Sequence, residues 1–151
     1  MADSTFLGQG MKFPPQINPA TGRFEISYGA MSVRESVYLI LTTQQSERPM
    51  RPEFGTNLMS YTFLDLNVTR LNMAIRTLQD QLSNQEPRIR DVSITADTVS
   101  RPGAILFDIS YVVRETNTHD NLVFPFYLNA APETVEGEIE PYEEPEIIEV
   151  E

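Results

Sequence analysis

The 151-residue sequence contains no cysteine. It therefore has no disulfide framework, no thiolate nucleophile and no cysteine-ligated zinc, a composition that suits assembly in a reducing cytoplasm. Histidine is nearly as scarce, since His119 is the only one. Without a second histidine or a cysteine beside it, we interpret His119 as a solvated residue of a turn at residues 117–121. We expect neither a metal nor a cofactor.

Lysine and long apolar runs are also scarce. Ten of the eleven basic residues are arginine and only Lys12 is lysine, which favours planar, bidentate ion pairs over diffuse attraction to a polyanion. No run of basic residues supports binding to nucleic acid. Residues 1–5 contain no basic residue, and the apolar run near them is too short to span a bilayer. We therefore expect neither nucleic acid nor a membrane as a partner, and no export by the general route.

Negative charge, by contrast, is concentrated at one end. Residues 133–151 hold nine glutamates and no base, so removing their nine charges from the net charge of −11 leaves residues 1–132 at −2. We expect residues 1–132 to form a single domain and residues 133–151 to be an acidic tail that is disordered in isolation. Ile147, Ile148 and Val150 are an apolar group within this tail. They could dock on a partner by adding a strand to a sheet edge, or the tail could simply solubilise the protein.

The first part of the chain predicts an extended arm, a short strand and a helix. Glycines and prolines make residues 1–20 an arm, and the alternation of residues 24–28 predicts a half-buried strand with Phe24, Ile26 and Tyr28 inward. Ser32 and Glu35 have the spacing of a capping box. The helix after them should end near residue 43, with one apolar face: Val33, Val37, Ile40 and Leu41.

Residues 44–55 predict a loop, and a helical turn around residues 57–63 is possible. A second helix then starts at the cap Asn67 and is limited by Pro87. Its buried stripe has helical spacing and consists of Leu71, Ile75, Leu78 and Leu82.

From residue 92 the apolar period changes from helical to two. Residues 92–96 and 105–113 alternate around a turn at residues 100–103, and residues 122–128 supply a third strand in which Pro125 indicates an edge or a bulge. The order is a short strand, two helices and an antiparallel meander of three strands. We therefore predict an α+β fold with the helices on one face of the sheet.

Carboxylates are numerous enough to test for a glycoside hydrolase. Such an enzyme needs two facing carboxyl groups, one of them with a raised pKa. Each of Glu47, Glu53 and Glu86 has an arginine one or two residues away, which favours the ionised form. We interpret them as ion-pair partners, and a peptidoglycan hydrolase using Glu47 or Glu86 stays an alternative.

Two segments, residues 46–55 and residues 85–90, have a composition that packing of a hydrophobic core does not explain. In each, proline stiffens the backbone beside an arginine, which lowers the entropy lost when the guanidinium binds a carboxylate. This arrangement suits an interface with another protein. The alternative is an internal one, in which Glu86 pairs with Arg48 or Arg51 and fastens the loop to the helix.

Several short motifs in a fixed order resemble the baseplate wedge family of contractile phage tails. This protein W family includes the sheath-initiating wedge subunit of T-even phages and its counterpart in type VI secretion baseplates. The resemblance covers roughly residues 10–128. It rests on Phe13-Pro14, the run 18–24, the helix 33–41, Glu47-Arg48, Met50-Arg51-Pro52, Phe54-Gly55 and Glu86-Pro87-Arg88.

The resemblance implies a structural subunit without catalytic duty, present in sixfold copies imposed by the virion tail baseplate and assembled in the host cytoplasm. It implies attachment to the wedge core through Glu86, Pro87 and Arg88, with the loop residues Glu47, Arg48 and Arg51 beside them. It also implies that the sheet offers an edge to first-ring sheath protein. Our candidate edge consists of Leu122, Val123, Phe124 and Phe126.

Two other functions stay open beside the structural one. Members of the family are sometimes labelled lysozyme-like, although nothing in the sequence supports that label. A regulatory module that binds a cytoplasmic protein, with the acidic tail as a mimic of a polyanion, is the third hypothesis. Binding to a basic protein that is sensitive to salt and is lost with residues 133–151 would favour it.

Overall fold

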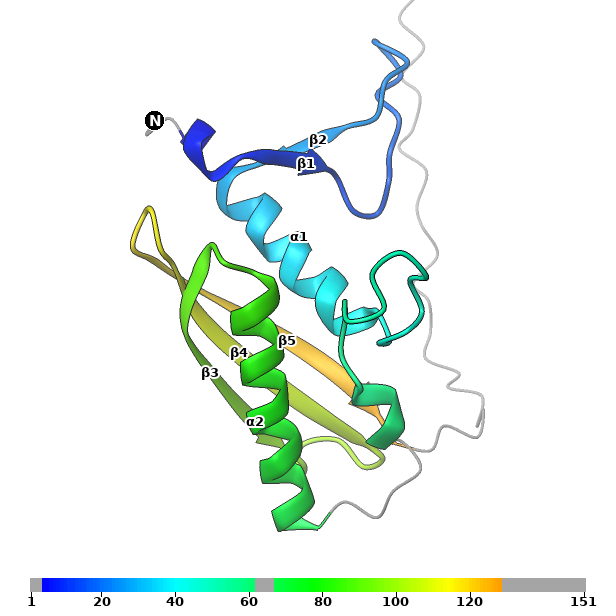
Figure 1. The fold of residues 1–151 in the computed structure, drawn as a ribbon, viewed down its shortest axis with the longest axis vertical. Helices are drawn as coiled ribbons and strands as arrows, with labels where there is room; N and C mark the ends of the chain where they lie inside the picture. The colour runs from blue at the N-terminus through cyan, green and yellow to red at the C-terminus, as the bar shows by residue number, and fades with distance from the viewer. Residues whose placement is uncertain (1–3, 62–66, 129–151) are drawn as a thin grey trace, which may run out of the picture.

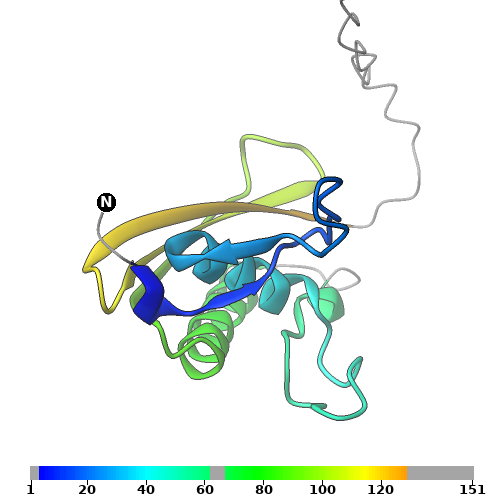
Figure 2. The same ribbon diagram turned by 90° about the horizontal axis from the view of Figure 1, so that it is seen from above.

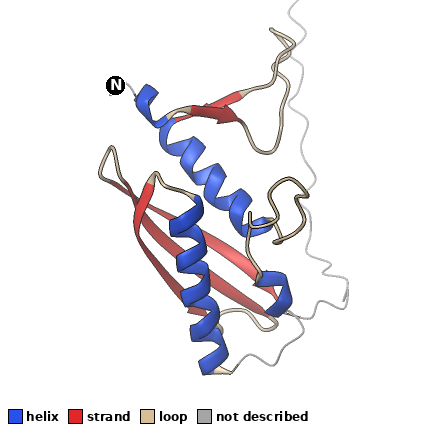
Figure 3. Ribbon diagram, viewed as in Figure 1, coloured by secondary structure: helices blue, strands red, loops and turns tan. Residues whose placement is uncertain are grey.

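The fold consists of two helices packed on one face of a three-stranded sheet, with a separate two-stranded ribbon at one end. The structure is a computed structural model that describes residues 4–61 and 67–128. Figures 1 and 2 show both long helices on the same side of the sheet, and Figure 3 shows the order of helices and strands along the chain. This arrangement confirms the predicted α+β class. The acidic tail, residues 133–151, lies outside the described residues.

Helix α1 (Gly29–Thr42) buries the predicted apolar stripe, but it begins one turn earlier than the sequence indicated. The capping box is wrong, because Ser32 lies inside the helix and is buried. The carboxylate of Glu35 instead accepts a hydrogen bond from the hydroxyl of Ser27, the residue before the N-cap position. The N-cap position is Tyr28, whose side chain makes no capping bond.

Helix α2 (Val68–Gln85) begins as predicted, since the side chain of Asn67 accepts a hydrogen bond from the backbone N–H of Arg70 at 2.9 Å. Its stripe is confirmed at Leu78 and Leu82, which are fully buried. Between the helices, residues 44–57 form a loop, and a short 3-10 helix, η2 (Leu58–Tyr61), follows. The loop protrudes away from the sheet (Figure 2).

The large sheet is an antiparallel meander in the order β3 (Ile89–Asp97), β4 (Ala104–Val113) and β5 (Thr118–Tyr127). Strand β5 starts earlier than predicted, so His119 is not in a turn but in a strand, opposite Val112. The interpretation of His119 as an exposed residue is nevertheless correct. Pro125 lies in an edge strand, as the sequence indicated. A bulge interrupts β3 between Arg90 and Ser93.

The N-terminal segment is more regular than the predicted arm. A 3-10 turn, η1 (Ser4–Leu7), precedes β1 (Gln9–Met11), which pairs antiparallel with β2 (Ile26–Tyr28). The predicted orientation of this second strand is wrong. Ser27 is buried against α1, whereas Phe24, Ile26 and Tyr28 are exposed. The short ribbon lies across the start of α1 and has no second layer of its own among the described residues (Figure 1).

One hydrophobic core joins the helices to the inner face of the large sheet. Alternate residues of β4 point into it, and η1 contributes Leu7. The largest fully buried side chains are Tyr111, Phe107, Ile40, Leu82, Ile89, Ile105 and Ile109. This core places the end of α2, and the Glu86-Pro87-Arg88 tripeptide that follows it, next to the start of α1.

Candidate partner-binding surfaces

Glu86 and Arg88 bind each other in a two-pronged ion pair. The Nε and Nη2 atoms of Arg88 each donate to one carboxylate oxygen of Glu86 at 2.7 Å. Glu86 is only 3% exposed. Pro87 between them turns the chain from α2 into β3, so both side chains point back to the same side. Such a pair combines geometric fit with charge and is the strong form of hydrogen bond.

The pair also holds the N-terminal segment in place. Nη1 of Arg88 donates to the carbonyl oxygen of Leu7 at 3.1 Å and to the hydroxyl of Ser32 at 3.5 Å. Through these contacts, three parts of the chain meet at one guanidinium: η1, the first turn of α1, and the junction of α2 with β3. We call this group the clasp, consisting of Glu86, Arg88, Leu7 and Ser32.

The clasp keeps Glu86 ionised. Burial by itself would raise the pKa of the Glu86 carboxyl, but hydrogen bonds from Arg88 and Ser36, together with the positive charge of Arg88, outweigh burial and hold that pKa below its ordinary value. The same bond to Glu86 raises the pKa of Arg88. The alternative in which Glu86 pairs with Arg48 or Arg51 is therefore wrong, because Arg88 takes both carboxylate oxygens.

The loop is nevertheless fastened to the end of α2, through Gln85, which was not among the predicted site residues. The side-chain amide of Gln85 accepts from the N–H of Gly55 at 2.7 Å and donates to the carbonyl of Gly55 at 2.9 Å. Gly55 has φ +99°, and a Cβ there would lie 2.2 Å from the carbonyl oxygen of Thr43. Only glycine fits this position. The two hydrogen bonds between Gln85 and Gly55 are the physical link between the loop and the end of α2.

The outer part of the loop presents two arginines around one aromatic ring. The guanidinium carbons of Arg48 and Arg51 lie 4.9 and 5.8 Å from the ring centroid of Phe54, within the range of cation–π contact. Glu47 accepts from the backbone N–H of Gln44 at 2.9 Å and so closes its own loop. Met50 at the tip is 94% exposed. The predicted loop residues thus contact other residues of the same loop and face solvent.

The sheet edge predicted from the sequence divides into two faces. Leu122 and Phe126 are buried in the core, Phe124 is half-buried, and Val123 is exposed on the opposite face. Strand β5 has β4 on one side and no described strand on the other. Its start is braced by Asp120, which accepts from the buried hydroxyl of Tyr111 at 2.8 Å and from Arg34 at 3.1 Å.

The register of β5 shows which of its amides point outward. In an antiparallel pair, alternate residues direct their N–H either to the partner strand or away from it. The N–H of Leu128 bonds to the carbonyl of Gly103, and Pro125, which has no N–H, has the opposite parity. Val123 and Tyr127 share that parity. Their N–H groups therefore point to the open edge, where a further strand can bind.

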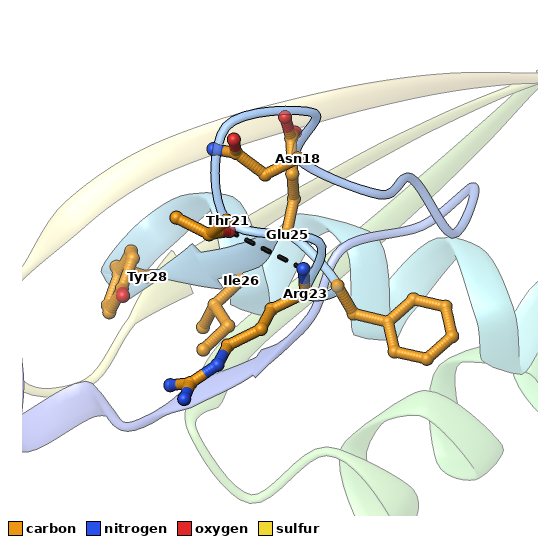
Figure 4. Close-up of a pocket in the computed structure, with 7 residues that line it drawn as sticks. Asn18, Thr21, Arg23, Glu25, Ile26 and Tyr28 are labelled. Atoms are coloured by element: carbon orange, nitrogen blue, oxygen red, sulfur yellow. Dashed lines mark hydrogen bonds between the residues drawn. The ribbon is translucent and has the colours of Figure 1, made fainter.

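Two hollows flank this edge and the ribbon. An apolar groove between the arm, α1 and β5 is lined by Phe13, Pro14, Met31, Arg34, Glu35, Tyr38 and Leu122. A second hollow lies on the outer face of the ribbon, with Asn18 and Thr21 on its turn and Ile26 and Tyr28 on β2 (Figure 4). Sequence reasoning missed the second hollow, because it placed these apolar side chains in the core.

Within residues 4–61 and 67–128, no helix combines the length and the apolar character that a bilayer crossing requires. The same residues bring together no group of three His, Asp or Glu side chains able to hold a metal ion.

Residues 20–118 match the family described as baseplate wedge protein gp25. The chain belongs to this family. The matched range contains the loop, α2 and the clasp pair Glu86 and Arg88, whereas β1, most of β5 and the acidic tail lie outside it. The predicted family is therefore confirmed, together with the predicted place in the virion tail baseplate.

Individual relatives agree with this gp25 assignment. The baseplate wedge protein gp25 of Enterobacteria phage T4 is 28% identical over 87 residues, which are 58% of this chain and 66% of that protein. The chain thus spans slightly less than two thirds of this relative. A crystal structure from Geobacter sulfurreducens, named provisionally as a tail lysozyme, is 41% identical with a TM-score of 0.59, over 66% of this chain and 90% of that one.

A more distant structure extends the likeness in fold alone. In the baseplate of the anti-feeding prophage, a chain of 22% identity has a TM-score of 0.55, over 81% of this chain and 86% of that one. It shows that the arrangement of helices on a short meander recurs in that chain.

Proposed function

We propose that this gp25-family protein is a non-enzymatic adaptor of the baseplate wedge, which anchors to the wedge core and initiates assembly of the tail sheath. The observation that carries the proposal is the open edge of β5, where the amides of Val123 and Tyr127 point outward. An extended segment of first-ring sheath protein would pair with this edge as an added strand.

The second surface, for the wedge core, is the loop with Arg48 and Arg51. These guanidinium groups are ordered by Phe54 and by the bonds between Gln85 and Gly55, so less entropy is lost when they bind a carboxylate or a helix end. The clasp gives Glu86 and Arg88 a different part in the same function. They fix the junction that supports the loop. Pro87 is exposed and Arg88 is partly exposed, so these two residues form the part of the tripeptide that is open to a partner.

Catalysis by Glu47 or Glu86 is not favoured by their surroundings. A general acid needs a raised pKa, whereas the pKa of Glu86 is lowered and its carboxylate is bound by Arg88 on both oxygens. Glu47 lies in an exposed loop and accepts a backbone hydrogen bond. These contacts support structural roles for both carboxylates.

The sheath role is tested by Val123→Pro. This change removes one outward N–H of β5 while the hydrogen bonds to β4, made by residues of the other parity, are kept. Purified baseplates carrying the variant should start sheath assembly about fivefold less well, since each lost main-chain bond contributes about 1 kcal/mol. The measurement is the fraction of baseplates that carry assembled sheath, counted by electron microscopy after baseplates are mixed with sheath protein.

Val123→Thr is the matched control, because threonine keeps the N–H and the β-branched shape. It should start sheath assembly as wild type does. If the proline variant is folded, as judged by circular dichroism and thermal unfolding, and yet starts sheath normally, the edge of β5 is not the sheath site.

A further inference from the structure

The ribbon exposes an apolar face that neither the wedge anchor nor the sheath edge uses. Register places Met11 opposite Ile26 and Ile17 opposite Phe24, and Tyr28 follows at the same parity along β2. These five side chains are between 46% and 62% exposed. We call them the ribbon face. Neighbouring apolar side chains that are exposed together on a small protein often mark an interaction site.

Two basic residues, Lys12 and Arg23, lie beside the ribbon face, and they differ in their ion pairs. Lys12 binds Glu25 at 2.8 Å. Arg23, by contrast, has no carboxylate within ion-pair distance among the residues that the structure describes, and it lines the hollow together with Phe24 and Ile26. The face therefore fits an apolar segment that is flanked by negative charge.

The chain itself contains such a segment. Residues 146–151 read Glu-Ile-Ile-Glu-Val-Glu, so Ile148 and Val150 fall on one side of an extended strand with glutamates between and beside them. This two-residue period matches the spacing of Phe24, Ile26 and Tyr28 along β2. The groove beside β5 fits an acidic segment less well, because Arg34 there is already bound to Asp120 and Glu35 adds a negative charge.

Length also permits the contact. Nineteen residues separate Leu128 from Ile148, and an extended chain of that length reaches roughly 60 Å, more than the ~40 Å width of a domain of this size. A tethered segment binds at an effective concentration in the millimolar range, which favours the chain's own tail over a second copy in dilute solution.

We propose that residues 146–150 of the acidic tail dock on the ribbon face in the free subunit, with Ile148 and Val150 against Met11, Ile26 and Tyr28, and with a flanking glutamate beside Arg23. The tail is then the cover of an apolar surface, and a baseplate partner can use that surface only by displacing it. This inference does not depend on the sheath or wedge contacts.

The absence of cysteine makes a direct test possible. In the full-length protein, Glu144→Cys accepts a nitroxide spin label at a single site just outside the docking segment, and labelled methionine methyl groups report on separate surfaces. Met11 lies on the ribbon face, Met31 in the groove, Met50 on the loop and Met73 on α2. The Met11 signal should weaken at least about twofold more than the other three, because the tether keeps the bound state populated.

Variants in the same labelled background distinguish docking from chance proximity. Ile148→Ser with Val150→Ser should restore the Met11 signal, whereas Ile139→Ser, a matched loss of an apolar tail residue, should leave it weakened. Equal weakening at Met50 and Met73 would overturn the proposal, and so would strongest weakening at Met31. Weakening of Met11 only when spin-labelled protein is mixed with separate methyl-labelled protein would assign the face to a second copy and would also overturn it.

Discussion

Arg88 shows how one side chain can organise a small protein. Its guanidinium donates two hydrogen bonds to Glu86 and a third to the carbonyl of Leu7, which lies 81 positions before Arg88 in the chain. Arginine suits this place because its planar fork matches a carboxylate and stays charged when partly buried. A variant such as Arg88→Ala, which leaves the carboxylate of Glu86 buried and unpaired, therefore affects folding as well as any partner contact.

At the residue scale we predict that Glu86→Gln lowers the free energy of unfolding by about 2–3 kcal/mol at neutral pH, because it removes a charged partner from a buried pair. Since the pKa of Glu86 lies below its ordinary value of 4.5 in the folded chain, the ion pair stabilises the fold fully above that value. The contribution is lost as pH falls through the lowered pKa. Urea unfolding over a series of pH values should show the difference from wild type shrinking in acid.

Glu53→Gln is the control, since Glu53 is exposed and lies 3.7 Å from Arg51. It should change stability by less than about 0.5 kcal/mol at any of these pH values. A difference between wild type and Glu86→Gln that stays constant down to low pH would contradict the assignment of a lowered pKa to Glu86.

At the scale of elements, the loop 44–57 depends on a single glycine. Gly55 faces the carbonyl of Thr43 on one side and is held by Gln85 on the other. The N–H of Thr56 also bonds to that carbonyl, at 2.8 Å. The end of α1, the loop and the end of α2 therefore meet at one position that has no room for a side chain.

We predict that Gly55→Ala destabilises the protein by about 2–3 kcal/mol, because a left-handed backbone and a clash with backbone atoms add together. Thermal and urea unfolding measure this. Gly103→Ala is the matched control, since Gly103 has φ +76° with no atom within 4 Å of the added Cβ, and it should cost only about 1 kcal/mol. Equal effects of the two changes would show that the space around Gly55 is not restrictive.

At the scale of the whole molecule, the possible interaction surfaces lie apart. The open edge of β5 borders the sheet, whereas the loop protrudes on the side of the helices (Figure 2). Arg48, Arg51 and Val123 are all exposed, outside the shared core, so we expect that either surface can be altered without unfolding the protein. This separation suits an adaptor that holds two partners at once.

We predict that Arg48→Ala with Arg51→Ala prevents incorporation into the wedge while the subunit stays folded, because both side chains are exposed and their loss leaves the bonds of Gly55 intact. Co-purification of tagged subunit with wedge proteins gives the readout. Arg76→Ala with Arg101→Ala removes the same charge from other exposed positions and should be incorporated normally. Incorporation of both double variants would remove the loop from the anchoring surface.

Local patterns in the sequence were sufficient for most of the elements. The cap Asn67, the hairpin of β3 and β4, and the edge position of Pro125 each depend on residues within a few positions of one another, and all appear as predicted. The predicted stripe of α2 is buried at Leu78 and Leu82 and partly buried at Leu71 and Ile75. The motifs also indicated the correct family. The capping box at Ser32 was wrong because local spacing does not show distant contacts. The hydroxyl of Ser32 accepts a hydrogen bond from Arg88, which is 56 residues away.

The sequence by itself determined the periodicities, the α+β order of elements and the concentration of charge in the tail, because these depend on neighbours along the chain. Only the tertiary structure decided that Glu86 binds Arg88 and Arg88 binds Leu7, that Gln85 fastens Gly55, and that the ribbon turns Ser27 inward and Ile26 outward. Alternation shows that a strand has two faces. Which face is covered depends on the helix that packs against it, and that contact is made between distant parts of the chain.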